Sequence, residues 1–339
     1  MTVEAELAFS VSDLAQMRFA VSPMWEVGPS LRLLRSGSGH PVHRPWAVQV
    51  RPRLAAAGLD RGRLAELVPP RGYVPDFLNP APAGPAPTLE EEVARIEAAS
   101  PAQVRRDLDR LGDEQGRLGP RTRALYADPR AGLARVTAEI TAYWELALAP
   151  YWARMRAVLD ADVFQRTRHV AEYGAARLFN DLHPSVSWGD NALRLAHRGR
   201  PLSRGAAGAG LVLIPSVFTG PGPFTRVTPP EPPQLAYPAR GTGSLWQPRG
   251  ASTGSRALAA VLGRSRTALL TELESPASTT ELALRTGLST GGVSQYLTAL
   301  RDAGLVSAHR AGRSVLYART SVAESLLAAS REVDPRGAR

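Results

Sequence analysis

Residues 289 to 301 combine polar and apolar side chains at the spacing of one helix. Val293, Leu297 and Leu300 fall at positions i, i+4 and i+7, so they form one buried face. The other face carries hydroxyl, amide and guanidinium groups, which can hydrogen-bond to base edges in the major groove of DNA. The pattern therefore predicts a helix that contacts double-stranded DNA. Its predicted contact residues are Ser289, Thr290, Gly291, Ser294, Gln295, Thr298 and Arg301.

A second group of candidate contact residues follows at the tip of a predicted hairpin, with strands at 305–309 and 314–318. Arginine at such a tip suits the phosphate backbone or the minor groove. The predicted contact residues here are Arg310, Arg313 and Ser314. Gly291 and Gly292 lie at the start of the predicted DNA-contacting helix, and each weakens that helix by about 1 kcal/mol. They also allow the helix N-terminus, whose amides and dipole favour an anion, to approach a phosphate closely.

The elements that position these residues are indicated by capping signals. One or two helices are expected over 258–273, and Ser278 with Glu281 forms a capping box that opens a helix over 279–286. Gly287 ends that helix, and Ser289 caps the next one, which we expect to end at Gly304. Two helices joined by a glycine turn and followed by a hairpin are typical of a winged helix-turn-helix.

The charge balance favours a polyanionic partner. The formal net charge of the 339 residues is +10, and between residues 256 and 319 eight Arg stand against four acidic residues. All 41 Lys+Arg residues are Arg, which codon bias in a GC-rich genome explains most simply. An anionic membrane surface is a weaker alternative, because the sequence has no block of consecutive basic residues.

The segments 278–283, 287–289 and 293–306 together resemble the ArsR-type winged helix regulators, although members often have His where this chain has Tyr296. The resemblance implies a DNA-binding transcriptional regulator, which we expect to be a repressor and a homodimer. Many relatives sense metals through Cys pairs or through His and acidic residues on a C-terminal helix. The chain has no Cys, and residues 320–330 contain no His, so we expect no metal site and no cofactor.

The remaining sequence predicts an α+β protein with two domains, at 1–245 and 255–330, because the chain is too long for one ordinary core. The first domain should be mainly helical, with a small antiparallel sheet within 185–238. Helices are expected over 13–20 and 151–182, an extended connector over 69–87, and a linker over 239–254.

The N-terminal part carries a second resemblance. Segments 19–26 and 73–77 resemble a domain of unknown function that precedes such winged helices in GC-rich bacteria, and this resemblance implies no activity. Our hypothesis is that this domain senses a small-molecule effector, dimerises, and sets the spacing of two DNA-contacting helices. We expect no enzyme, since no nucleophile elbow or matched acid-base set occurs. An enzymatic N-terminal domain and a winged helix used as a protein-interaction scaffold remain the alternatives.

Three further features have ordinary explanations. His40 and His43 form an H-x-x-H that we interpret as a surface feature and not as a metal site. A group of aromatic residues could line a ligand pocket, although core packing is the favoured interpretation. The longest apolar stretch, about 205–218, is too short to span a bilayer, so we expect a cytoplasmic, nucleoid-associated protein. The aromatic residues considered for the ligand pocket are Trp144, Tyr151, Trp152 and Tyr173.

Overall fold

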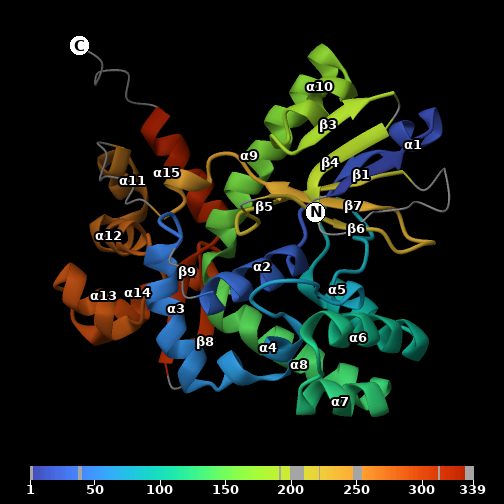
Figure 1. Cartoon of the computed structure of the whole chain (residues 1–339). Coiled ribbons are helices and arrows are strands. Elements are labelled where there is room, and N and C mark those ends of the chain that lie inside the picture. Colours follow the sequence, from blue (N-terminus) through green and yellow to red (C-terminus); the bar gives the residue numbers. More distant parts are fainter. Residues whose placement is uncertain are drawn as a thin grey trace. The chain divides into compact units, whose positions relative to one another are not determined.

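The computed structural model describes residues 3–36, 40–190, 192–198, 210–220, 222–246, 254–311 and 314–332 (Figure 1). It is an α+β fold, as the sequence predicts, and it divides into two compact units. Unit 1 comprises Met1–Pro41, Leu59–Thr141 and Val158–Thr242. Unit 2 comprises Val42–Gly58, Ala142–Ala157 and Gly243–Arg339, so it includes two segments from the first half of the chain. The sequence-based limits 1–245 and 255–330 stay a prediction.

The small antiparallel sheet lies in unit 1. Its strands β1 (Val3–Ala8), β4 (Ala192–Arg198) and β3 (Val186–Gly189) are hydrogen-bonded in the order β1-β4-β3. The register pairs Leu7 with Leu193 and Val186 with Leu195. These four residues are buried in one cluster with Phe179. Alternation of apolar and polar residues therefore places one face of the sheet against the core of unit 1.

The expectation of one small antiparallel sheet within 185–238 is corrected, because the later strands of this region form a second, mixed sheet of unit 1. Its order is β2-β5-β7-β6, with β2 at Arg18–Phe19, β5 at Val212–Ser216, β7 at Gln234–Pro238 and β6 at Phe224–Arg226. β5 pairs in parallel with both β2 and β7, while β6 is antiparallel to β7. Every residue of β5 is buried. A continuous apolar run of this kind identifies a buried strand but gives no information on its direction.

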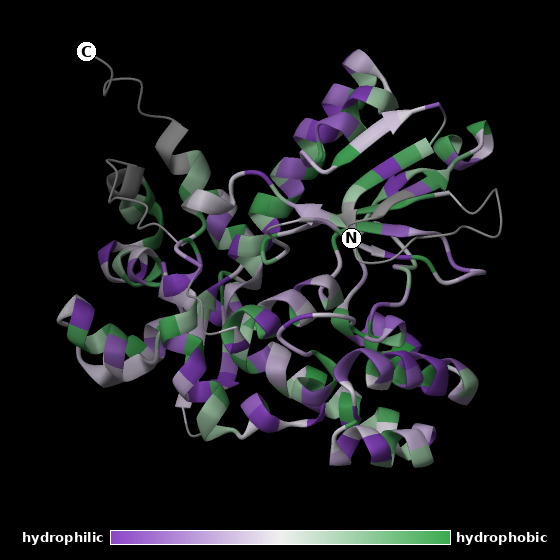
Figure 2. Ribbon diagram, in the orientation of Figure 1, coloured by the Kyte–Doolittle hydropathy of each residue, from purple (hydrophilic) through white to green (hydrophobic). Residues whose placement is uncertain are grey.

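Helices surround these sheets in unit 1, and α6 carries both polar and apolar residues along its length (Figure 2). Thr88 and Glu91 form a capping box at the start of α5, and Ser100 caps α6. Helix α8 begins in unit 1 and ends in unit 2, while α9 begins in unit 2 and ends in unit 1. The helices are α1 (Val11–Ala15), α2 (Met24–Arg35), α4 (Arg63–Leu67), α5 (Leu89–Glu97), α6 (Pro101–Gln115), α7 (Pro120–Ala127), α8 (Pro129–Ala147), α9 (Ala149–Tyr173) and α10 (Ala175–Asn180).

Three expectations for unit 1 are corrected. The helix expected over 13–20 is the shorter α1, and β2 starts at Arg18. The helix expected over 151–182 is divided into α9 and α10 by Gly174, whose φ of 81° lies in the left-handed region. The connector 69–87 is not simply extended, because it contains the 3-10 turn Asp76–Leu78 and buries Phe77. In the linker 239–254, residues 247–253 lie outside the described part.

Glu26 is a buried carboxyl that ties α2 to the end of β5. Its carboxyl oxygens accept hydrogen bonds from the Ser216 hydroxyl at 3.0 Å, from the Val217 amide at 2.9 Å and from the Phe218 amide at 3.2 Å. Burial raises the pKa of Glu26 to about 8, although these hydrogen bonds oppose the shift. The folded state therefore binds a proton at Glu26 more tightly than the unfolded chain does.

This raised pKa predicts that part of the stability is lost as pH rises. The contribution of Glu26 is fully present below its unfolded pKa of about 4.5 and disappears as pH approaches 8. Glu26→Gln mimics the protonated form, so the variant should lose stability less steeply than the wild type over this range. Urea unfolding midpoints of both proteins across the range measure the difference. Parallel pH curves for the two proteins would contradict the prediction.

Unit 2 contains the predicted winged helix. Val293, Leu297 and Leu300 share its apolar core with Leu270 and Leu282, as the spacing predicted. Ala277 pairs with Tyr317 and adds a bridge to the hairpin. The elements are α3 (Arg44–Ala56), α11 (Gly254–Leu262), α12 (Arg264–Glu272), α13 (Thr279–Thr286), α14 (Thr290–Asp302), β8 (Val306–Ala311), β9 (Ser314–Arg319) and α15 (Ser321–Glu332), with the 3-10 turns Leu59–Arg61 in unit 1 and Thr242–Ser244 at the boundary.

The two early segments of unit 2 contact the winged helix and the chain before it. Arg154 of α9 donates to the Glu274 carbonyl at 3.0 Å, next to the turn that precedes α13. His309 of β8 lies 3.4 Å from a carboxylate oxygen of Glu145 on α8. The indole of Trp246 donates to Nδ1 of His43 at 3.0 Å, and His43 is buried. The interpretation of His43 as a surface residue is therefore wrong, because it packs against this indole.

The aromatic residues considered for a ligand pocket do not form one set. Trp144 and Tyr151 are buried in unit 2, and Trp144 packs edge-to-face on Trp152 with ring centroids 5.1 Å apart. Tyr173 belongs to unit 1 and is 58% exposed. Core packing therefore accounts for Trp144, Tyr151 and Trp152. In the described part of the chain, no helix is long and apolar enough to cross a membrane.

Candidate nucleic-acid interface

The turn between α13 and α14 is fixed by its caps. Ser278 and Glu281 form the predicted capping box at the start of α13. Gly287 ends that helix with a φ of 72°, a conformation that costs other residues strain. The Ser289 hydroxyl then accepts from the Gly292 amide at 3.2 Å and caps α14. Local sequence therefore sets the angle at which α14 leaves the turn.

The predicted contact face of α14 is exposed to solvent. Gln295 and Ser294 make no side-chain hydrogen bond within the described part of the chain. The Thr298 hydroxyl donates to the Ser294 carbonyl at 3.0 Å, which leaves its oxygen as an acceptor. Arg301 pairs only loosely with its neighbour Asp302, at 3.6 Å between exposed side chains. The exposed residues are Ser289, Thr290, Gly291, Ser294, Gln295, Thr298 and Arg301.

Gly291 leaves space at the start of this face. A Cβ atom at Gly291 would meet no atom within 4 Å, and at Gly292 it would lie 3.2 Å from the Ser289 hydroxyl. The protein itself therefore does not require glycine at 291. Because Gly291 has no side chain, the main chain in the first turn of α14 is accessible to a large ligand such as the phosphate backbone of a nucleic acid.

The structure describes the hairpin as far as Ala311 and again from Ser314. Arg310 and Ser314 are exposed, and the last pair in the described register is Ala311 with Ser314. Arg313 lies outside the described residues. Arg310 makes no ion pair with the described residues, so its guanidinium group is available to a phosphate.

The structure adds one arginine that the sequence analysis did not place. The guanidinium group of Arg266 on α12 lies 5.6 Å from the centroid of the Tyr296 ring on α14. A Cβ atom at Gly292 would lie 3.9 Å from that same ring, so Arg266 stands near the first turn of α14. The arginine count contained Arg266, but only the packing of α12 on α14 could show its position.

Arg319, one of the eight arginines between residues 256 and 319, does not contribute to a basic surface. Arg319 was counted in the basic balance, but it is buried and donates to the carbonyls of Leu270 at 2.5 Å and Thr271 at 2.6 Å. It also pairs with Glu324. Arg319 therefore caps the C-terminal end of α12 and is unavailable to a phosphate. The exposed arginines of the winged helix include Arg264, Arg266, Arg285, Arg301 and Arg310.

A short turn between α13 and α14, an exposed polar face on α14 and a basic hairpin define a winged helix-turn-helix DNA-binding domain. Residues 268–308 match the family model described as "Bacterial regulatory protein, arsR family". The C-terminal part of the chain therefore carries an ArsR-type helix-turn-helix, a DNA-binding domain of transcription regulators. No curated protein and no solved structure matches the chain.

Among the described residues, no group of three or more His, Cys, Asp or Glu residues could hold a metal ion. The last described helix, α15, ends at Glu332 and contains no His. The chain contains no Cys.

Proposed function

We propose that this protein is a sequence-specific transcriptional repressor that inserts α14 into the major groove of its operator. The observation that carries the proposal is the division of α14 into a buried face and an exposed polar face. Val293, Leu297 and Leu300 hold the helix to the core, so Gln295 and Arg301 point to solvent. The amide of Gln295 suits adenine, and the guanidinium group of Arg301 suits guanine.

The proposal includes a homodimer and a ligand-sensing unit 1. A two-fold dimer would place two copies of α14 about one helical turn of DNA apart and would read a palindromic operator. An effector would act by binding the DNA-competent and DNA-incompetent states with different affinity. The protein would work in the cytoplasm, associated with the nucleoid, and unit 1 would not be an enzyme.

Binding to the DNA upstream of the protein's own gene tests the proposal. Fluorescence anisotropy across a salt series compares this duplex with a scrambled duplex of the same composition. We expect preferential binding to the natural duplex, weakened by salt in both cases. Absence of binding to either duplex at low salt would refute the proposal. It would favour the alternative that the winged helix is a protein-interaction scaffold. Under that alternative, substitutions on α14 would not change how the protein interacts with DNA.

Arg310 should contribute affinity without specificity. Arg310→Ala removes one phosphate contact, so the slope of log K against log salt should decrease by about 1. The loss should be similar on the natural and the scrambled duplex, because a phosphate contact does not distinguish sequences. Arg130→Ala on α8 is the control, since it also removes an exposed positive charge but lies outside the winged helix. An unchanged slope for Arg310→Ala would exclude the tip from the interface.

A further inference from the structure

Helix α3 of unit 2 exposes a basic face. The helix contains three arginines and no acidic residue. Its buried face is apolar, whereas Arg44, Val48 and Arg51 recur at positions i, i+4 and i+7 on the exposed face. Arg44 makes no ion pair with the described residues. The positive charge on this face is therefore not balanced by any acidic residue of the same helix.

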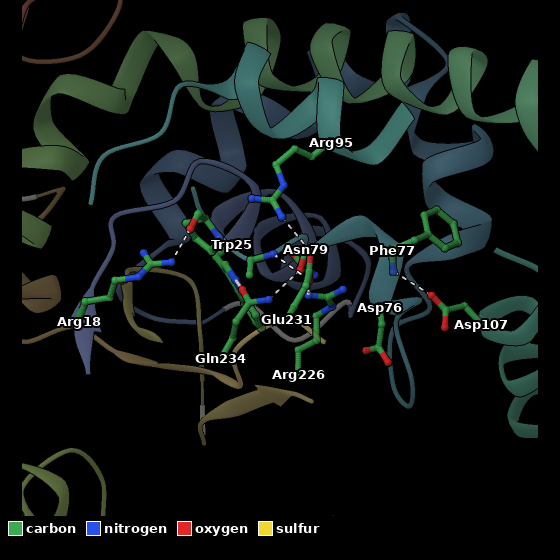
Figure 3. Close-up of polar contacts among 12 residues, drawn as sticks. Arg18, Trp25, Asp76, Phe77, Asn79, Arg95, Asp107, Arg226, Glu231 and Gln234 are labelled. Atoms are coloured by element: carbon green, nitrogen blue, oxygen red, sulfur yellow. Dashed lines mark hydrogen bonds and ion pairs between the residues drawn. The ribbon is translucent and has the colours of Figure 1, made fainter. Parts of the chain in front are cut away.

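Arginines in the interior of unit 1 are balanced in a different way. Figure 3 shows Arg95 and Arg226 directed at one carboxylate, Glu231, which pairs with both. Arg226 is only 4% exposed, so this cluster of charges belongs to the interior of the fold. The exposed face of α3, by contrast, presents its charge to the solvent or to a partner outside the chain.

The outer face of the hairpin, which points away from the core of the winged helix, contacts the end of α8. Val306 lies in that core, so His309, three residues later on the strand, points to the opposite face. Leu316 pairs with His309 in the register and is nevertheless only 2% exposed. His309 lies 3.4 Å from a carboxylate oxygen of Glu145. The end of α8 therefore lies against the outer face, close to the hairpin tip.

Helix α3 is attached to this same end of α8. The Trp46 indole donates to the carbonyl of Ala147, two residues beyond Glu145, at 2.8 Å. The Tyr151 hydroxyl, near the start of α9, donates to the Gln49 side chain at 2.9 Å. Helix α3 thus packs on the corner between α8 and α9, and this corner lies beside the hairpin.

The C-terminal end of α3 approaches the first turn of α13. The pKa of Glu281 is lowered chiefly by the hydrogen bond from the Ser278 amide, and the positive charge of Arg53 adds to this effect. The chain enters α13 running toward the hairpin tip, because Ala277 pairs antiparallel with Tyr317 of β9, which runs away from the tip. The first helix of a helix-turn-helix crosses the DNA backbone. Both ends of α3 therefore lie near elements that the repressor proposal places on DNA.

We propose that Arg44 and Arg51 bind phosphates of the DNA that flanks the operator on the side of the hairpin. The proposal rests on the proposed function, since the hairpin tip and α13 define which side of unit 2 faces DNA. Seven residues of helix span about 10 Å, whereas the phosphates of one strand follow each other about every 3.4 Å along the duplex. Each arginine can therefore bind a separate phosphate. These contacts lengthen the footprint and add affinity without sequence preference, because a phosphate carries no sequence information.

Anisotropy titrations of the full chain across a salt series test the contact with the double variant Arg44→Gln/Arg51→Gln. Glutamine keeps a polar side chain that suits a helix, but it has no charge with which to release counterions from DNA. On the natural duplex, the slope of log K against log salt should decrease by about 2 relative to the wild type. Hydroxyl-radical cleavage of the same duplex should lose protection at the edges of the footprint and keep it at the centre.

Arg130→Gln/Arg135→Gln is the matched control, because it removes two exposed charges from one helix, α8, within unit 1. It should keep the slope and the footprint of the wild type, and circular dichroism checks the fold of both double variants. The proposal is overturned if the wild-type slope or the wild-type footprint persists in Arg44→Gln/Arg51→Gln. That result would leave the repressor proposal standing, whereas a wild type that binds no DNA at low salt would refute both.

Discussion

Replacing Arg301 with alanine should lower the affinity for the operator about tenfold or more, because a bidentate contact to guanine contributes about 1–3 kcal/mol of discrimination. The fold should be unaffected. The Arg301 side chain is 51% exposed, and its ion pair with Asp302 at 3.6 Å is too exposed to add much stability. The core residues Leu297 and Leu300 keep α14 in place in the variant. The lost affinity should therefore report on DNA contact alone.

Anisotropy titrations on the natural and scrambled duplexes measure this effect. Arg301→Ala should reduce the ratio of the two affinities, whereas Arg310→Ala should lower both affinities together. Gln295→Ala should resemble Arg301→Ala, since both side chains lie on the exposed face of α14. Arg130→Ala controls for the change in net charge. If Arg301→Ala and Arg130→Ala bind the natural duplex equally well, α14 does not read the operator.

The winged helix could be predicted because its signals are local. The Ser278 capping box, the left-handed Gly287 and the Ser289 cap each act within four residues, so they fix the bounds of α13 and α14 from sequence. The exposed face of α14 follows from helical spacing alone. Arg319 could not be placed in this way, because its partners at Leu270 and Thr271 lie in another element. The same reason explains why the position of Arg266 beside Tyr296 was missed.

Unit 1 was less predictable, because its architecture depends on contacts between distant segments. The parallel pairs of β5 join residues near 18, 212 and 234, and no short-range signal specifies such a pairing. The segment Val42–Gly58 belongs to unit 2, although it is separated from the winged helix by some two hundred residues of chain. Its place there depends on packing, such as the bond from the Trp46 indole to the Ala147 carbonyl at 2.8 Å.

The largest expected effect on stability lies at Asp162 of α9 in unit 1. Its carboxylate pairs with Arg166 at 2.9 Å, and both side chains are almost completely buried. It also accepts from the Tyr237 hydroxyl at 2.9 Å and from the Arg240 amide at 3.1 Å. The Arg166 guanidinium group lies 4.6 Å from the centroid of the Tyr237 ring. One carboxylate thus satisfies groups from α9, β7 and the chain beyond β7.

Asp162→Asn should destabilise unit 1 by about 3–5 kcal/mol, because it leaves the Arg166 charge buried without a counter-charge. Asparagine keeps one acceptor, but its amide group would face the donors of Arg166 or Tyr237. Burial raises the pKa of Tyr237, so its hydroxyl stays a donor and cannot compensate for the lost charge. A loss of this size is a large part of the about 5–15 kcal/mol that stabilises an ordinary domain.

Urea unfolding monitored by circular dichroism measures the effect of Asp162→Asn. Arg168→Gln is the control, since it breaks the Arg168–Glu172 pair, which has the same spacing on the same helix but is exposed. That variant should keep nearly all of the wild-type stability, because an ion pair in full contact with solvent contributes little. Equal midpoints for the two variants would show that burial of the Asp162–Arg166 pair adds nothing to its effect. A large loss confined to Asp162→Asn would show that the buried pair holds α9 to the end of β7.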